Sequence, residues 1–293
     1  MAATGAQSNG ELTTIGVAGA GFMGSGIAES AASAGLYVIA YEPQRAALDR
    51  SREAIATSTA RAAERGKLSS GERDELIGRI DYTSDLDQLA QADLVVEAIV
   101  EDVAAKSELF ARLDELAPAA TLLASNTSSI PIAQLASATG RPDRVVGLHF
   151  FSPVPVMPLV EIVRALDSSD ATVASAEWFV TKIAKTPIHT KDRSGFIVNM
   201  LLVPYLMAAV RMYEEGFADA GSIDEGMRLG CGHPMGPLTL CDFIGLDVLY
   251  SVCDSLYEEF KQPAYAPPPL LKRMVVSGRL GRKTGRGFYD YSS

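Results

Sequence analysis

The most informative segment of the chain is Thr14-Ile15-Gly16-Val17-Ala18-Gly19-Ala20-Gly21-Phe22-Met23-Gly24. Its first five residues are mostly apolar, as in a buried strand, and they lead directly into a GxGxxG turn. A helical pattern follows from Ser25 to Ala34, and a second apolar strand is expected over 36–41. Strand, helix and strand within about 30 residues are typical of a parallel α/β sheet that binds a dinucleotide.

The three glycines of the turn have separate roles in such a domain. Gly19 and Gly21 allow a tight turn and a close approach of the backbone to a pyrophosphate, and Gly24 lets the helix pack closely on the strand. Glu42 comes 18 positions after Gly24, where a carboxylate accepts hydrogen bonds from the adenosine ribose hydroxyls and repels a 2′-phosphate. We therefore expect NAD as the cofactor. Arg45 leaves NADP as the less favoured alternative, because its guanidinium can pair with that phosphate.

The rest of the pattern predicts two domains. Two long polar helices without a strand are expected over 44–78, and strands resume at 94–99, 121–124 and 145–150, followed by 159–163 and 186–189. From Gly195 onward the pattern is helical, at 197–215, 222–229, 246–260 and 268–277. We expect a flexible tail at 1–11, a Rossmann-type α/β domain with a doubly wound sheet and an inserted helical hairpin at 12–193, and an all-helical domain at 194–293.

Composition and charge narrow the class of protein. Of 293 residues, 47% are hydrophobic and 21% charged, as in soluble globular proteins, and the net charge of −10 argues against nucleic acid or an anionic membrane as partner. The longest apolar run, 201–210, is too short to span a membrane. Cys231, Cys241 and Cys253 form no CxxC pair and no cluster with histidine, so we expect no metal site and a reducing compartment. The first eleven residues lack a signal-peptide pattern, so the cytoplasm is the expected location.

One histidine and one carboxylate stand out as catalytic candidates. His149 ends a predicted strand, and ligands of open α/β sheets bind at that edge. Glu161 lies twelve residues later within the apolar run 159–163, where a carboxylate is costly to bury unless something pairs with it. If the two strands lie side by side, Glu161 orients the His149 ring and stabilises its protonated form, as a general base requires. A core histidine bonded to the backbone is the alternative; His189 and His233 are interpreted as structural.

Two further polar groups have a structural and a functional interpretation each. The segment Ser125-Asn126-Thr127-Ser128-Ser129-Ile130-Pro131 follows a strand and leads into a helix, so its side chains are expected to cap that helix. One hydroxyl can do so while its neighbour faces the cofactor. Asn199 is polar at an apolar helix start and is either a packing amide or a contact to a substrate carbonyl.

Several segments together resemble one enzyme family, the L-3-hydroxyacyl-CoA dehydrogenases, and within it the bacterial 3-hydroxybutyryl-CoA dehydrogenases. The resemblance runs from about Thr14 to Tyr291. It is carried by Gly19-Ala20-Gly21-Phe22-Met23-Gly24, Ser125 to Ser129, His149-Phe150-Phe151, Gly195 to Asn199, His233-Pro234-Met235-Gly236-Pro237 and Gly281-Arg282-Lys283-Thr284-Gly285.

The resemblance implies a role for each matching residue. His149 would be the catalytic acid/base with Glu161 behind it, and Ser128 and Asn199 would contact the 3-oxygen and the thioester region of the substrate. Contacts to the cofactor are implied for Gly19 to Gly24, Glu42, Glu101, Lys106, Ser128, Ser152 and Lys283. Family members are dimers held by the helical domain, so a homodimer is expected.

A local excess of positive charge supports a site for coenzyme A. Between Gln44 and Lys67 there are six basic and three acidic residues, in a chain whose net charge is −10. Ser58 and Arg65 fall at the positions where the family binds the 3′-phosphate of CoA, and arginine can bind phosphate with two hydrogen bonds. A solvated helix face remains the alternative.

The expected function is the reversible NAD-dependent oxidation of a short-chain (3S)-3-hydroxyacyl-CoA, with 3-hydroxybutyryl-CoA giving acetoacetyl-CoA. Ser152 stands where an asparagine usually follows His-Phe-Phe, and Pro158 and Met200 stand where many relatives carry Lys and Arg. These departures leave the acyl group and its carrier open, including an acyl-carrier protein. A free 3-hydroxyacid dehydrogenase and a non-catalytic NAD-binding protein are the remaining alternatives.

Overall fold

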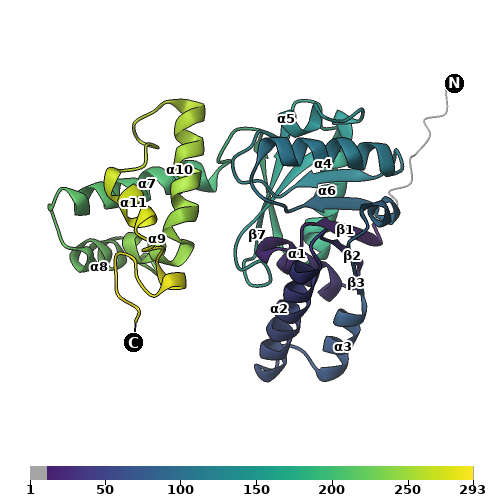
Figure 1. Cartoon of the computed structure of the whole chain (residues 1–293), viewed down its shortest axis with the longest axis horizontal. Helices are drawn as coiled ribbons and strands as arrows, with labels where there is room; N and C mark the ends of the chain where they lie inside the picture. The colour runs from purple at the N-terminus through teal and green to yellow at the C-terminus, as the bar shows by residue number, and fades with distance from the viewer. Residues whose placement is uncertain (1–11, 293) are drawn as a thin grey trace. The chain divides into compact units, whose positions relative to one another are not determined.

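The computed structural model describes residues 12–292, which divide into two units between Asp192 and Arg193 (Figure 1). The expected tail at 1–11 lies outside the described residues. The first unit is built on one eight-stranded sheet, and the second is built of helices. This confirms the predicted fold class, an α/β domain followed by a helical one.

The sheet changes direction once. Its strand order is β3-β2-β1-β4-β5-β6-β7-β8, parallel as far as β6; β7 then runs antiparallel to β6, and β8 is parallel to β7. The order reverses between β1 and β4, which is where open α/β sheets bind their ligands. The strands are β1 (Thr14–Ala18), β2 (Tyr37–Tyr41), β3 (Ile80–Thr83), β4 (Leu94–Glu97), β5 (Leu122–Ser125), β6 (Val145–Phe150), β7 (Leu159–Arg164) and β8 (Thr186–Lys191).

The expectation that the sheet resumes only at residue 94 is wrong, because β3 precedes it. This strand is four residues long and pairs only with β2, at the edge of the sheet. Ile80 and Thr83 are buried while Asp81 is exposed, so the strand has no continuous apolar run to mark it. Because Ile80 and Thr83 are three residues apart, they face opposite sides of the sheet, so burial in this short strand does not alternate either.

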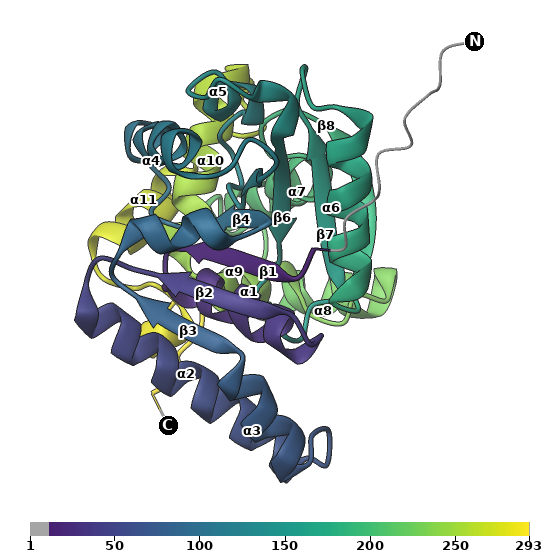
Figure 2. The same cartoon turned by 90° about the vertical axis from the view of Figure 1, so that its right-hand side faces the viewer.

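Helices cover both faces of the sheet (Figure 2). The predicted hairpin is present as α2 and α3, although α3 has only nine residues and begins at a capping box of Ser69 and Glu72. The helices of this unit are α1 (Phe22–Ser33), α2 (Arg45–Glu64), α3 (Ser70–Gly78), α4 (Val103–Leu116), α5 (Ile132–Ala136) and α6 (Asp170–Lys182), with 3₁₀ turns η1 (Leu86–Gln91) and η2 (Pro142–Arg144).

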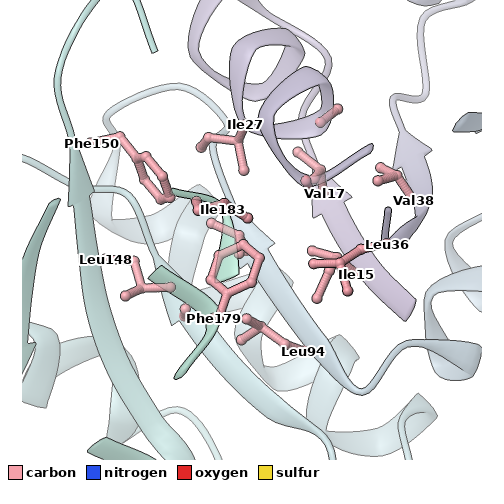
Figure 3. Close-up of a cluster of buried hydrophobic side chains, with 14 of the residues drawn as sticks. Ile15, Val17, Ile27, Leu36, Val38, Leu94, Leu148, Phe150, Phe179 and Ile183 are labelled. Carbon is pink, nitrogen blue, oxygen red and sulfur yellow. The ribbon is translucent and has the colours of Figure 1, made fainter. Parts of the chain in front are cut away.

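Alternation along the strands decides which side chains enter the core. In β1, Ile15 and Val17 point to the face covered by α1 and α6, where they join Ile27 and Phe179 in one buried cluster (Figure 3). Leu148 and Phe150 of β6 belong to the same cluster. The residues between these positions face the other side of the sheet, and that opposite face carries the polar groups described below.

The second unit has its own core and its own buried carboxylates. Asp224 accepts hydrogen bonds from the N–H groups of Leu238 and Thr239 at the start of α9, and Asp242 accepts from those of Phe288 and Tyr289. Both carboxylates are buried and hold loops or helix starts in place. The helices are α7 (Val198–Glu214), α8 (Ala220–Cys231), α9 (Pro237–Ile244), α10 (Leu246–Phe260) and α11 (Pro269–Val276), with the 3₁₀ turn η3 (Arg282–Thr284).

Candidate active site

The turn after β1 needs its glycines for steric reasons. Gly19 has a φ of 104°, and a Cβ there would lie 2.6 Å from the carbonyl oxygen of Ala98. A Cβ on Gly24 would lie 1.8 Å from the carbonyl oxygen of Gly19. Helix α1 starts at Phe22, and within residues 12–292 no side chain caps it and no acidic residue lies in its first turn. Its N–H groups and its dipole therefore suit a pyrophosphate.

Glu42 lies beside this turn, because the register of β1 and β2 places Ala18 opposite Tyr41. Its Oε2 accepts a hydrogen bond from the N–H of Ala20 at 3.4 Å, and its Oε1 accepts from Gln44 at 3.2 Å. Arg45, at the start of α2, is exposed. The glycine turn, the uncapped helix start and this carboxylate fit the adenosine and pyrophosphate parts of NAD.

His149 and Glu161 come together because β7 returns antiparallel beside β6. The two residues are direct partners in the register, and alternation places both on the face opposite the apolar cluster. The Nδ1 of His149 lies 2.6 Å from Oε2 of Glu161. His149 is 6% exposed and Glu161 is fully buried. The side chain that holds Nδ1 is thus a carboxylate, which fixes the orientation of the ring.

Glu97 is a buried carboxylate that the sequence analysis missed. It ends β4 on the same face of the sheet, opposite Ser125 of β5. Its side chain accepts hydrogen bonds from the Nζ of Lys106 at 2.5 Å, the Oγ of Ser125 at 2.6 Å and the N–H of Ile99 at 2.7 Å. Burial raises the pKa of Glu97, and these three donors oppose that shift. A carboxylate inside an apolar strand was the available signal, as it was for Glu161.

Lys106 and Glu101 connect Glu97 to the segment that follows β5. Lys106 is 1% exposed, and its Nζ lies 3.2 Å from Oε2 of Glu101. Oε1 of Glu101 accepts hydrogen bonds from the Oγ1 of Thr127 at 2.5 Å and the N–H of Ser128 at 2.9 Å. Burial raises the pKa of Glu101, but the Lys106 ammonium and these donors together hold it below its ordinary value. The structure therefore brings Glu101, Lys106 and Ser128 together where β4 and β5 end.

The expectation that side chains of the Ser125–Pro131 segment cap the next helix is wrong. The first N–H groups of α5, those of Ile132 and Ala133, donate to the carboxylate of Asp192 at 2.8 and 2.7 Å. Asn126 uses its Oδ1 to accept from the N–H of Phe150 at 2.9 Å, which joins the end of β5 to the end of β6. Ser152, two residues farther on, is exposed.

Of the two residues expected to hold the CoA phosphate, Ser58 lies on α2, and Arg65, seven positions farther on, directly follows the last residue of that helix. The Oγ of Ser58 donates a hydrogen bond to Oε1 of Glu29 on α1 at 2.8 Å. Arg65 is exposed at the end of the helix and takes part in no ion pair within the described part of the chain. The sequence analysis did not include Glu29.

The remaining candidates lie in the second unit. Asn199 is half-buried in the first turn of α7, and the Nζ of Lys283 lies 2.6 Å from the carboxylate of Asp247. Nδ1 of His233 lies 3.1 Å from the hydroxyl of Tyr205. In the first unit, Nε2 of His189 lies 3.3 Å from Glu177 at the surface.

Two negative findings apply to the described part of the chain. Over residues 12–292, no helix has the length and apolar character needed to cross a membrane. No group of three or more His, Cys, Asp or Glu side chains in the same range is arranged to hold a metal ion.

Known proteins match the chain along almost its whole length. Residues 14–193 match the NAD binding domain of 3-hydroxyacyl-CoA dehydrogenase, and residues 195–291 match its C-terminal domain. The chain is 53% identical over 283 residues to a 3-hydroxybutyryl-CoA dehydrogenase of Mycobacterium tuberculosis, covering 96% of this chain and 99% of the relative. It is 46% identical over 281 residues to a probable 3-hydroxybutyryl-CoA dehydrogenase of Bacillus subtilis, covering 96% and 98%.

Solved structures also match this chain along almost its whole length. The crystal structure of FadB2 from M. tuberculosis has a TM-score of 0.94 at 52% identity and covers 96% of this chain and 99% of that one. (S)-3-hydroxybutyryl-CoA dehydrogenase PaaH1 from Ralstonia eutropha has a TM-score of 0.91 at 43% identity, covering 96% and 100%. Because both domains of the family match in order, on a fold with a fitting dinucleotide turn, the chain belongs to the 3-hydroxyacyl-CoA dehydrogenase family and is an NAD-dependent oxidoreductase.

Proposed function

We propose that this enzyme interconverts (3S)-3-hydroxybutyryl-CoA and acetoacetyl-CoA, with NAD as its cofactor. The observation that carries the proposal is the 2.6 Å contact between His149 and Glu161 at the edge of the sheet where the strands β4, β5 and β6 end. The short acyl chain is supported by the relatives that are 53% and 46% identical and bear the name 3-hydroxybutyryl-CoA dehydrogenase.

In this reaction His149 is the acid/base that handles the proton of the substrate's 3-hydroxyl. Since Nδ1 is committed to Glu161, the proton is exchanged at Nε2. Glu161 keeps the ring in orientation and stabilises the positive charge that the ring gains. NAD, when bound, supplies the acceptor for the hydride that leaves C3.

Other residues hold the two ligands in this proposal. We assign Ser128 and Asn199 to contacts with the 3-oxygen and the thioester region, and Ser58 and Arg65 to the 3′-phosphate of CoA. The glycine turn and Glu42 hold the adenosine and pyrophosphate of NAD; Glu101, Lys106, Ser152 and Lys283 complete its surroundings. Support comes from the cluster of Glu101, Lys106 and Ser128 at the ends of β4 and β5.

The proposal extends to assembly and location. We place a homodimer interface in the helical unit, where several large apolar side chains are exposed, among them Leu201, Phe217 and Leu229. Size-exclusion chromatography with light scattering tests it, and a monomer at micromolar concentration contradicts it. The cytoplasm is the proposed location, supported by three cysteines that form no disulfide.

The deciding experiment is the oxidation of NADH and of NADPH by acetoacetyl-CoA, followed in parallel by absorbance. Rapid turnover with NADH supports the reaction, the carrier and the role of Glu42. A preference for NADPH would keep the reaction and contradict the ribose assignment. Turnover only with an acetoacetyl-acyl-carrier protein would move the proposal to that carrier, and NADH binding without any turnover would contradict it.

A further inference from the structure

A buried carboxyl group lies directly behind one of the proposed phosphate ligands. Glu29, in the middle of α1, is 8% exposed, and its Oε1 accepts the hydrogen bond of the Ser58 hydroxyl at 2.8 Å. No lysine, arginine or histidine forms an ion pair with it within residues 12–292. Burial raises the pKa of Glu29, and the bond from Ser58 opposes that shift.

Three arginines in or beside the neighbouring helices α2 and α3 bind groups other than Glu29. Arg52 of α2 stacks on the ring of Tyr82 in β3, with 4.6 Å between guanidinium carbon and ring centre, and pairs with Asp49. Burial is the main cause that raises the pKa of the Tyr82 hydroxyl, and the charge of Glu29 adds to this shift. On the α3 side, Arg79 donates to the carbonyl oxygen of Ala32 and pairs with Glu75. Arg73 of α3 donates to the carbonyl oxygen of Ala56.

The protonation state of Glu29 determines what Ser58 presents to a ligand. A serine hydroxyl has one proton to donate, and an ionised carboxylate can only accept a hydrogen bond. When Glu29 is ionised, Ser58 must therefore donate its hydroxyl proton to Glu29. Its remaining lone pairs then face outward, and they repel a phosphate oxygen. A neutral Glu29 can instead donate to Ser58, which releases the serine proton for the ligand.

Two guanidinium groups close to Ser58 can bind an anion, and the direction in which the Ser58 hydroxyl donates its proton affects that binding. Arg61 follows Ser58 by three residues and Arg65 by seven, which places both on the same side of α2. Both are exposed, and neither forms an ion pair in the described range. An anion held there would meet two cations and one hydroxyl, and the hydroxyl helps only if it donates.

We propose that Glu29 is a positioning residue that controls, through Ser58, how tightly α2 holds a phosphate, with the neutral carboxyl as the binding form. This rests on the proposed function, since the phosphate is the 3′-phosphate of CoA. Glutamine at position 29 imitates the neutral form at every pH, because its amide group can always donate to Ser58.

The first test measures the affinity for adenosine 3′,5′-bisphosphate by titration calorimetry, for wild type and Glu29→Gln, between about pH 5.5 and 8.5. The phosphate itself titrates near pH 6, so the ratio of the two affinities at each pH is the quantity of interest. We expect the wild-type affinity to weaken relative to that of Glu29→Gln as the pH rises, by about 3- to 10-fold overall. Glu53→Gln, the same change at an exposed position of α2, should follow the wild type.

The second test uses the whole reaction and separates KM from kcat. With acetoacetyl-CoA and NADH, the alkaline difference between wild type and Glu29→Gln should be in KM, with kcat equal. Ser58→Ala, introduced into both proteins, should abolish the difference between them. The Ser58→Ala variant alone keeps the proposal testable if Glu29→Gln folds poorly, because it should lose the alkaline weakening of affinity relative to the acid end.

The outcomes are distinct. Identical pH curves for wild type and Glu29→Gln, or no binding of the bisphosphate to the wild type at any pH, overturn the inference. A wild type that gains affinity relative to Glu29→Gln as the pH rises also overturns it, since Ser58 would then accept from the ligand. Absence of any turnover with acetoacetyl-CoA contradicts the proposed function instead.

Discussion

The charged side chains at the edge of the sheet where β4, β5 and β6 end differ in burial and in pairing from those on the exposed side of α2. At the sheet edge, Glu97 and Glu161 are fully buried, and Lys106 and His149 hold them at 2.5 and 2.6 Å. On α2, Arg61 and Arg65 are exposed and have no ion pair within residues 12–292. His149 and Glu161, which are proposed to handle the proton, are thus already in position, and this limits reorganisation during the reaction. The cations on α2 remain available to an anionic ligand.

The largest expected effect comes from removing the base at the sheet edge. His149→Ala should lower kcat by about 10²- to 10⁴-fold, the usual contribution of a positioned general base. Affinity for NADH should stay within about twofold, because the loss concerns the chemical step. His189→Ala removes an exposed histidine and is the control. Near wild-type turnover of His149→Ala would contradict the assignment of the proton transfer to this edge of the sheet.

The second prediction concerns stability and the buried ion pair. Lys106→Met leaves Glu97 buried without its cation, so the free energy of unfolding in urea should fall by about 3–5 kcal/mol. The double variant Glu97→Gln, Lys106→Met should recover part of that loss, because the uncompensated charge is gone. Lys182→Met, at an exposed position of α6, is the matched control. Equal losses for the single and double variants would mean that the pairing of charges is not what stabilises this region.

Weakening the partner of His149 should have a smaller effect than removing His149. Glu161→Gln keeps the shape and removes the charge that stabilises the protonated ring, so kcat should fall about 10- to 100-fold. KM should change little, since Glu161 is buried behind the ring. Steady-state kinetics with acetoacetyl-CoA measures both; a change confined to KM would place Glu161 in binding rather than in the handling of the proton.

Substitutions of the basic residues of α2 are expected to change KM rather than kcat. Arg65→Ala should raise KM for acetoacetyl-CoA about 3- to 10-fold with kcat unchanged at saturation, because one charge-assisted hydrogen bond to a phosphate is lost. Lys182→Ala removes an equal charge from another surface of the same unit and should leave KM unchanged. If the two variants behave alike, the positive charge of α2 acts only through the overall field of the protein.

The smallest expected effect is the pH dependence of stability at Glu29. Burial raises the pKa of this carboxyl in the folded state, so its contribution to stability is fully present below the unfolded value of about 4.5. That contribution is lost as the pH rises through the folded value. In urea unfolding, wild type should therefore lose stability relative to Glu29→Gln as the pH rises. A constant difference would show that Glu29 has the same pKa in both states.

The sequence predicts the His149–Glu161 contact because two neighbouring strands with alternating burial leave few other places for a buried carboxylate. The same reasoning applies to Glu97, whose partner Lys106 follows one turn into the next helix. Contacts between distant segments escape such reasoning. Asp192 binds the start of α5 across 60 positions, and Glu29 reaches Ser58 across 29. No local pattern links those residues, since the packing of separate helices sets their distance.

The contact between His149 and Glu161 depends on one exact register of β7 against β6. Side chains alternate along a strand, so a shift of β7 by one position against β6 would turn every side chain of β7 to the other face of the sheet. Val160 or Ile162 would then face His149, and Glu161 would turn into the apolar cluster around Leu148 and Phe150. Because registers of paired strands differ by whole residues, no intermediate register exists in which His149 keeps a weakened contact to Glu161.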